Sequence, residues 1–178
     1  MALQLSTKDT AEFLRWTLKL GWSAVPDVVC WVESLIESSD EPADWMLDFG
    51  WNKSAYADEI DLLLDKIPGM ATDDLPRKLA AALIGRRWLD HRCDDAQLSS
   101  VWCKLYPEFP RTAETDHAAD VWQYLDEVLL NLVYGGRTYV DLSTAHAQLA
   151  KRLEKYHEFL EPAERLLAEL RRRASLSC

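Results

Sequence analysis

Apolar and polar residues recur at helical spacing along most of the chain. In the longest such segment, residues 112–134, the apolar positions are Ala118, Val121, Trp122, Leu125, Val128, Leu129 and Leu132. Their spacing of three and four is typical of an amphipathic helix with one broad apolar stripe. Thr112 can cap this helix and Gly135-Gly136 can end it. We expect a central helix about 33 Å long, with Val121, Trp122, Leu125 and Leu129 nearly buried.

Further helices are predicted on both sides of this segment. Periodic apolar residues bounded by capping residues, prolines and glycines predict helices over residues 7–20, 23–37, 54–67, 73–92 and 94–105, and a short helix or turn over 44–51. Residues 137–141 are compatible with a short extended piece, although an isolated strand has no partner. The sequence therefore predicts an all-α fold of eight or nine helices, in a single domain spanning residues 1–178.

The last part of the chain has heptad spacing. Leu149, Leu153, Tyr156, Leu160, Ala163, Leu167 and Leu170 alternate four and three residues apart and would form one narrow seam. Pro162 interrupts this pattern, so we expect the helix to kink or restart there. A coiled-coil dimer is one interpretation, but three heptads with a proline favour packing within the chain.

The negative charge of the chain is concentrated in its first 75 residues. The formal net charge is −10, from 20 basic and 30 acidic side chains. Residues 1–75 hold 15 acidic and five basic side chains, whereas residues 76–178 hold 15 of each. A solvated surface explains this charge, and so does an acidic face for a basic protein partner. Nucleic acid is disfavoured as a partner, because phosphates require a basic patch.

The chain shows no sign of membrane insertion or secretion. No apolar run approaches the roughly 18 residues that span a bilayer, and the first residues lack the basic and apolar regions of a secretory signal. The four cysteines, Cys30, Cys93, Cys103 and Cys178, form no CxxC pair. We therefore expect a cytoplasmic protein with reduced thiols and no membrane contact.

Residues 54–67 combine an apolar and an acidic helix side. Tyr56, Ile60, Leu63, Leu64 and Ile67 share one side, and Leu62 projects among acids on the other, away from the core. A lone exposed leucine needs no function, but an apolar residue ringed by acids is also typical of an interface anchor. We predict a partner-binding face formed by Asp40, Glu41, Asp44, Asp48, Asp58, Asp61, Leu62 and Asp65.

The motifs of metal and covalent chemistry are weak. Two Glu-x-x-His motifs, Glu114–His117 and Glu154–His157, have the spacing used in di-iron carboxylate bundles. Those bundles need glutamates from two further helices, and both histidines here fall beside the apolar stripes, so solvated side chains explain the motifs better. No nucleophile elbow or phosphate loop is present. We expect no metal, no cofactor and no catalytic residue.

Residues 12–51 resemble a known class of protein. Trp16, Gly21-Trp22, the helix from Val28 to Ile36 with Trp31, and the Asp40-Glu41-Pro42 turn leading to Trp45, Leu47 and Asp48 carry the resemblance. Together they are similar to small acidic all-helical bacterial proteins of polymorphic toxin systems, including immunity proteins. Immunity proteins are not enzymes, and the resemblance implies stoichiometric binding and neutralisation of a cognate, basic toxin. The alternatives are a metal-dependent helical enzyme and an intracellular adaptor.

Overall fold

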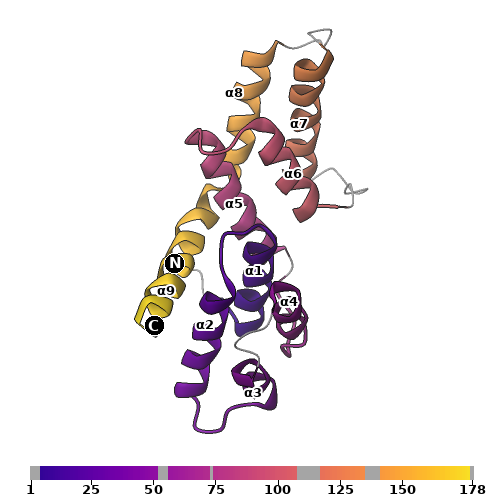
Figure 1. Cartoon of the computed structure of the whole chain (residues 1–178). Coiled ribbons are helices and arrows are strands. Elements are labelled where there is room, and N and C mark those ends of the chain that lie inside the picture. Colours follow the sequence, from indigo (N-terminus) through magenta and orange to yellow (C-terminus); the bar gives the residue numbers. More distant parts are fainter. Residues whose placement is uncertain (1–4, 52–55, 73, 108–116, 135–140, 177–178) are drawn as a thin grey trace. The chain divides into compact units, whose positions relative to one another are not determined.

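The computed structural model describes residues 5–51, 56–72, 74–107, 117–134 and 141–176 (Figure 1). Within these ranges the chain forms nine α-helices, one 3-10 helix and no strand, which confirms the predicted all-α fold. The elements are α1 (Thr7–Lys19), α2 (Val25–Glu37), α3 (Asp44–Trp51), α4 (Ala57–Asp65), α5 (Leu75–Leu89), α6 (Asp95–Leu105), α7 (His117–Tyr134), α8 (Leu142–Leu153), the 3-10 helix η1 (Glu154–Phe159) and α9 (Leu160–Leu176).

The chain divides into two compact units. Unit 1 comprises residues 1–80 and 162–178, and unit 2 comprises residues 81–161. The prediction of one domain spanning residues 1–178 stays a prediction.

Local capping signals set the start and the end of α1. The Ser6 hydroxyl accepts a hydrogen bond from the backbone N–H of Asp9 at 3.0 Å, and the Asp9 carboxylate accepts one from the Ser6 N–H at 3.1 Å. This reciprocal arrangement satisfies two backbone donors that a helix start otherwise leaves unpaired. Gly21 follows the helix with a φ of +69°, a left-handed conformation that glycine adopts without strain.

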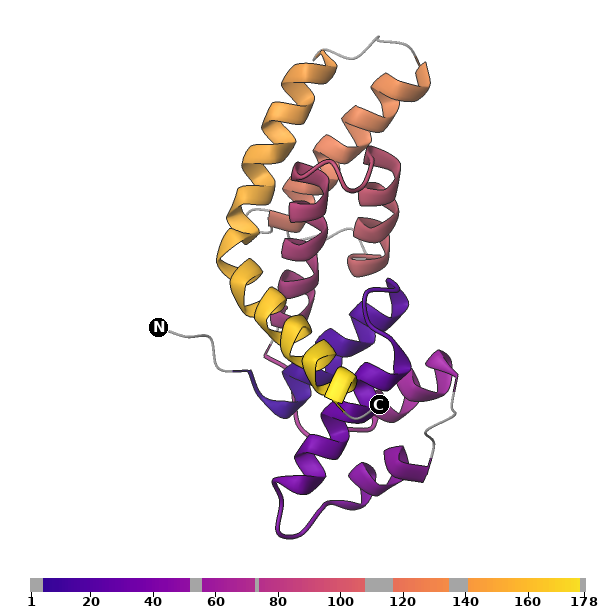
Figure 2. The same cartoon turned by 60° about the vertical axis from the view of Figure 1, so that its left-hand side comes forward.

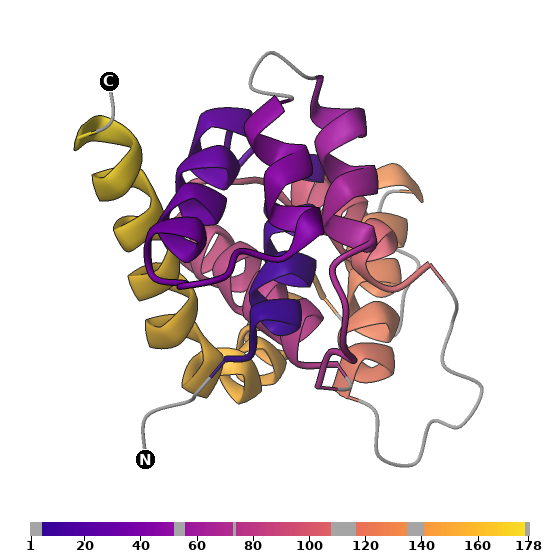
Figure 3. The same cartoon turned by 90° about the horizontal axis from the view of Figure 1, so that it is seen from below.

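The core of unit 1 is built from apolar stripes on several helices. α1 packs against α4, and α3 packs against α2 and α4. Figure 3 shows these indigo and purple helices lying side by side, with α9 in yellow along the same group. The fully buried side chains of the group include Phe13 and Leu14 of α1, Val28 of α2, and Ile60 and Leu64 of α4.

The core of unit 2 centres on Trp102 of α6. α7 lies against α6 and α8, as Figure 2 shows. Trp102 is fully buried, its indole N–H donates to the carbonyl of Ala118 at 3.3 Å, and its ring packs edge-on against Tyr156 at 5.5 Å. Burial of such a large aromatic side chain contributes strongly to stability, and here it joins α6, α7 and η1.

The predicted central helix is present over His117–Tyr134, and residues 112–116 lie outside the described ranges. Val121 and Leu125 are fully buried as predicted. The expectation for Trp122 and Leu129 is wrong, because both are only half-buried at the flank of the stripe. The indole of Trp122 reaches the carbonyl of Tyr106 at 3.4 Å. Within unit 2, α7 packs against α6 and α8, and Asp120 of α7 pairs with Lys155 of η1 at 3.4 Å.

The heptad seam near the C-terminus is buried throughout, from Leu149 to Leu170. The helix does restart as predicted, although the interruption comes slightly earlier. η1 separates α8 from α9, and α9 begins at Leu160, so Pro162 occupies its first turn. A proline is tolerated there because the first backbone N–H groups of a helix have no partner within the helix.

Candidate functional site

α4 presents its carboxylates to two different environments. Leu62 is 62% exposed, as predicted, and Asp58 is exposed one turn before it. Asp61 instead faces α1 and is half-buried, which corrects the prediction that the whole acidic side points away from the core. Because α1 and α4 pack against each other, a position that sequence periodicity assigns to solvent is covered by a neighbouring helix.

Asp61 and Asp65 are held by cations of α1. The guanidinium of Arg15 donates to Asp61 at 2.9 Å and also pairs with Asp65, while Lys19 lies 3.2 Å from Asp61. Lys8 donates to the backbone carbonyl of Asp65 at 2.9 Å. These contacts give both acids a role in joining α1 to α4.

The pairing of Asp61 with Arg15 shifts the pKa values of both side chains in favour of their charged forms. Burial alone would raise the pKa of Asp61, but hydrogen bonds from Arg15 and Lys19 outweigh it, and the pKa lies below its usual value. Burial would likewise lower the pKa of Arg15, yet the hydrogen bond with Asp61 and the nearby negative charges raise it. Both side chains therefore stay charged over the neutral pH range.

A third carboxylate in unit 1 is also engaged internally. Asp9 is 1% exposed and accepts hydrogen bonds from Ser6 and from the backbone N–H and hydroxyl of Thr72, at 2.6 and 3.1 Å. Burial would raise the pKa of Asp9, but the hydrogen bonds from Ser6 and Thr72 lower it overall. We call Asp9, Asp61 and Asp65 the inner carboxylates.

Asp65 is itself exposed although Arg15 pairs with it, and the remaining predicted acids also lie at the surface. Asp40, Glu41, Asp44, Asp48 and Asp58 are all exposed, and we call them the outer carboxylates. Asp44 and Asp48 belong to α3, Asp58 belongs to α4, and these two helices pack together. The structure thus separates the predicted acidic residues into two groups with different surroundings.

Most of the exposed large apolar side chains belong to unit 1, as the outer carboxylates do. Of the described residues, five large apolar side chains are exposed, and four of them belong to unit 1: Leu47, Tyr56, Leu62 and Met70. Leu47 on α3 follows Asp44 by three residues, and Leu62 on α4 follows Asp58 by four, so each leucine neighbours a carboxylate on its own helix. We call the outer carboxylates with Leu47 and Leu62 the acidic face.

The prediction that Tyr56 lies on the apolar side of its helix is wrong. The helical projection places it on the apolar side of α4, but it is 80% exposed because it precedes the helix as its N-cap residue. Outside the helix, an advance of about 100° per residue does not apply. The predicted start of this helix, at residue 54, lies outside the described residues.

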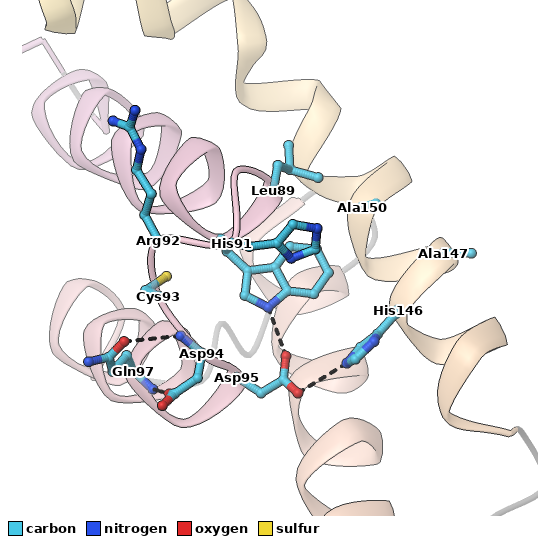
Figure 4. Close-up of a pocket in the computed structure, with 11 residues that line it drawn as sticks. Leu89, His91, Arg92, Cys93, Asp94, Asp95, Gln97, His146, Ala147 and Ala150 are labelled. Carbon is cyan, nitrogen blue, oxygen red and sulfur yellow. Dashed lines mark hydrogen bonds and ion pairs between the residues drawn. The ribbon is translucent and has the colours of Figure 1, made fainter.

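Unit 2 contains a cavity that sequence patterns do not predict. It has a volume of about 730 Å³ and lies among the C-terminal end of α5, the loop after it, the start of α6 and the middle of α8 (Figure 4). Trp88, Leu89, His91, Asp95, His146 and Ala150 are among its lining residues.

Three of the side chains that line this cavity are joined by hydrogen bonds. The indole N–H of Trp88 donates to one carboxylate oxygen of Asp95 at 2.7 Å, and His146 Nε2 lies 3.0 Å from the other. Because an ionised carboxylate only accepts hydrogen bonds, His146 donates through Nε2. The three residues come from α5, α6 and α8, so no short sequence motif could have indicated them.

The thiol in the cavity lining has no sign of activation. Burial raises the pKa of Cys93, with Asp94 and Asp95 adding to the effect and Arg87 opposing it. A reactive cysteine needs a lowered pKa, so the structure gives Cys93 no role as a nucleophile.

Only one of the two Glu-x-x-His motifs lies wholly within the described residues. Glu154 and His157 are exposed on η1, while Glu114 and the side chain of His117 lie outside the described residues. In the part of the chain that the structure describes, no three His, Cys, Asp or Glu side chains are arranged to hold a metal ion. No described helix combines the length and the apolar character needed to cross a membrane.

No protein-family model matches the chain, and neither the curated proteins nor the solved structures compared with it give a match.

Proposed function

We propose that the protein binds a basic protein partner through its acidic face, and that this partner is a toxin whose activity it blocks. The observation that carries the binding proposal is the coincidence of exposed apolar side chains with outer carboxylates on α3 and α4. Interfaces commonly combine apolar anchors with a charged rim. Leu47 and Leu62 would be the anchors, and Asp44 and Asp58 would belong to the rim.

The pairing inside unit 1 strengthens this proposal. Lys8, Arg15 and Lys19 of α1 pair with Glu12 and with the inner carboxylates. These three make up most of the five basic side chains among residues 1–75. The positive charges of these three side chains are therefore paired with nearby acids of α1 and α4. The outer carboxylates keep an excess of negative charge, which suits a basic partner.

The toxin part of the proposal rests on the resemblance of residues 12–51 to immunity proteins. α3 and the Asp40-Glu41-Pro42 turn belong both to that resemblance and to the acidic face. Neutralisation would follow if the bound protein covers the toxin's active surface, which requires no catalytic group in this chain. An adaptor would bind through the same face without blocking an activity.

The first test identifies the partner and measures binding kinetics. The wild type and the Leu62→Asp variant are used side by side to purify partners from the native host, and a basic protein retained only by the wild type is then produced pure. We expect association to slow as salt rises, because the Debye length is about 10 Å at 0.1 M. Asp58→Asn should reduce the association rate, and Leu62→Asp or Leu47→Asp should speed dissociation.

Leu89→Asp provides a matched control, since Leu89 is an exposed leucine of unit 2. It should leave partner binding unchanged. Rates that are indifferent to salt and to every change on α3 and α4 would leave the acidic face as a solvated surface and overturn the binding proposal. Coexpression with the partner then separates the two classes: growth protection supports neutralisation, and binding without protection supports an adaptor.

A further inference from the structure

The cavity in unit 2 has the size of a small-molecule site. Its volume of about 730 Å³ lies within the range of roughly 300–1,000 Å³ that is typical of ligand pockets. All of its lining residues belong to unit 2, so it is distinct from the acidic face.

The walls of the cavity favour a flat, apolar ligand body. Trp88 contributes an indole whose ring meets the imidazole of His146 edge-on, with the centroids 5.5 Å apart. Leu89, Ala147 and Ala150 add aliphatic surface. Aromatic rings prefer stacked or edge-to-face neighbours, so an aromatic ligand fits these walls best.

The acids of the cavity are already hydrogen-bonded. Asp94 caps α6 by accepting from the Gln97 N–H at 2.7 Å, and the Gln97 side chain accepts from the Asp94 N–H at 3.0 Å. Asp95 accepts from Trp88 and His146, one hydrogen bond on each oxygen. These groups stabilise the fold locally, which leaves the imidazoles of His91 and His146 as the polar groups best suited to a ligand.

His146 is oriented for such a contact. Its Nε2 donates to Asp95, so its Nδ1 is the nitrogen left for another partner, and its side chain is 38% exposed. A carboxylate ligand at Nδ1 would favour the doubly protonated ring, which donates to two carboxylates at once. Asp95 thereby positions the imidazole.

His91 occupies a backbone position that favours glycine. Its φ is +57°, and it is the one non-glycine residue with positive φ among the described residues. It lies just after α5, where its N–H donates to the Trp88 carbonyl at 3.0 Å, a turn that usually carries glycine. Strained residues of this kind cluster at functional sites, and Figure 4 shows the His91 imidazole within the group of residues that line the cavity.

We propose that this cavity binds a small aromatic carboxylate, with its ring against Trp88 and its carboxylate hydrogen-bonded by His146 and His91. Arg92 lies at the rim and adds a positive charge. The carboxylates of Asp94 and Asp95 already accept hydrogen bonds from Gln97, Trp88 and His146. An anion can instead accept hydrogen bonds from the imidazole of His91 and, once Nδ1 takes up a proton on binding, from His146.

Isothermal titration calorimetry of the full chain tests this proposal with three matched probes. The probes are 2-naphthoate, its neutral amide 2-naphthamide, and the cationic 2-(aminomethyl)naphthalene. We expect 2-naphthoate to bind at one site and more tightly than the other two by roughly tenfold, the effect of a hydrogen bond to a charged group. Equal binding of all three, preference for the cation, or no binding of 2-naphthoate would each overturn the proposal.

Substitutions locate the site and separate function from folding. His91→Gly relieves the left-handed backbone, so its melting temperature should stay unchanged or rise by about 2 °C, while 2-naphthoate affinity falls. His146→Gln and the cavity-filling Ala147→Trp should also weaken binding, by roughly tenfold or more. His157→Gln, an exposed histidine outside the cavity, is the matched control. Binding that survives both His91→Gly and His146→Gln would refute the assignment of the donors.

Discussion

Asp58 and Asp61 lie three residues apart on α4, yet they differ in exposure to solvent and in the side chains that surround them. Asp61 lies in the α1–α4 contact, where the Asp61 and Arg15 side chains are 18% and 19% exposed. Asp58 lies on the acidic face and is exposed. The same side chain therefore stabilises the fold in one region and remains available to a partner in the other. What decides between the two roles is the neighbouring helix.

The comparison extends to the other acids of unit 1. The inner carboxylates accept hydrogen bonds from α1 or from Thr72, and the pKa values of Asp9 and Asp61 are lowered as a result. The outer carboxylates are exposed and add charge to the surface. Substitutions should therefore affect folding in the first group and binding in the second.

The largest expected effect is on Asp9. Asp9→Ala removes a buried acceptor from Ser6 and from the backbone N–H of Thr72, and it should lower the free energy of unfolding by about 3 kcal/mol. Urea denaturation measures this loss, with Asp58→Ala as the exposed control. If both variants lost the same small amount, the division into inner and outer carboxylates would have no energetic basis.

A smaller effect is expected from the pair in the α1–α4 contact. A double-mutant cycle with Arg15→Met and Asp61→Asn should give a coupling free energy of about 1–2 kcal/mol, because the pair is shielded from solvent and hydrogen-bonded. The same cycle with Asp58→Asn in place of Asp61→Asn should give a coupling near zero. A coupling as large for Asp58 as for Asp61 would contradict the structural distinction between them.

Acid should weaken the fold through the inner carboxylates. Since the folded-state pKa values of Asp9 and Asp61 lie below the unfolded value of about 3.9, their contribution is complete above that pH and is lost as the pH falls through the folded values. Each loss should be smaller than that of Asp9→Ala, because a protonated carboxyl still accepts hydrogen bonds. Thermal unfolding between pH 2 and pH 6 should show a shallower slope for Asp9→Ala than for the wild type.

The smallest effects on stability are expected on the acidic face. Leu62→Asp and Leu47→Asp should change the free energy of unfolding by no more than about 0.5 kcal/mol, because both side chains are exposed. Urea denaturation checks this directly, and circular dichroism confirms the helix content. A loss above 1 kcal/mol, about the scale of one ordinary hydrogen bond, would show that these leucines support the fold.

Several elements were predictable from the sequence because their causes are local. The start of α1 follows from the reciprocal caps of Ser6 and Asp9, its end from Gly21, and the span of α3 matches the predicted residues 44–51. The heptad spacing likewise predicted every buried residue of the seam between Leu149 and Leu170. Helix formation and amphipathic periodicity depend on residues three or four positions apart, so the sequence expresses them directly.

Only the tertiary structure decided how the chemically active side chains are used. Periodicity placed Asp61 in solvent, but Arg15, 46 residues earlier, covers it once α1 packs on α4. Trp88, Asp95 and His146 form one hydrogen-bonded trio although His146 lies 51 residues after Asp95. Such contacts depend on which helix faces meet, and that is set by the packing of whole apolar surfaces and not by any short motif.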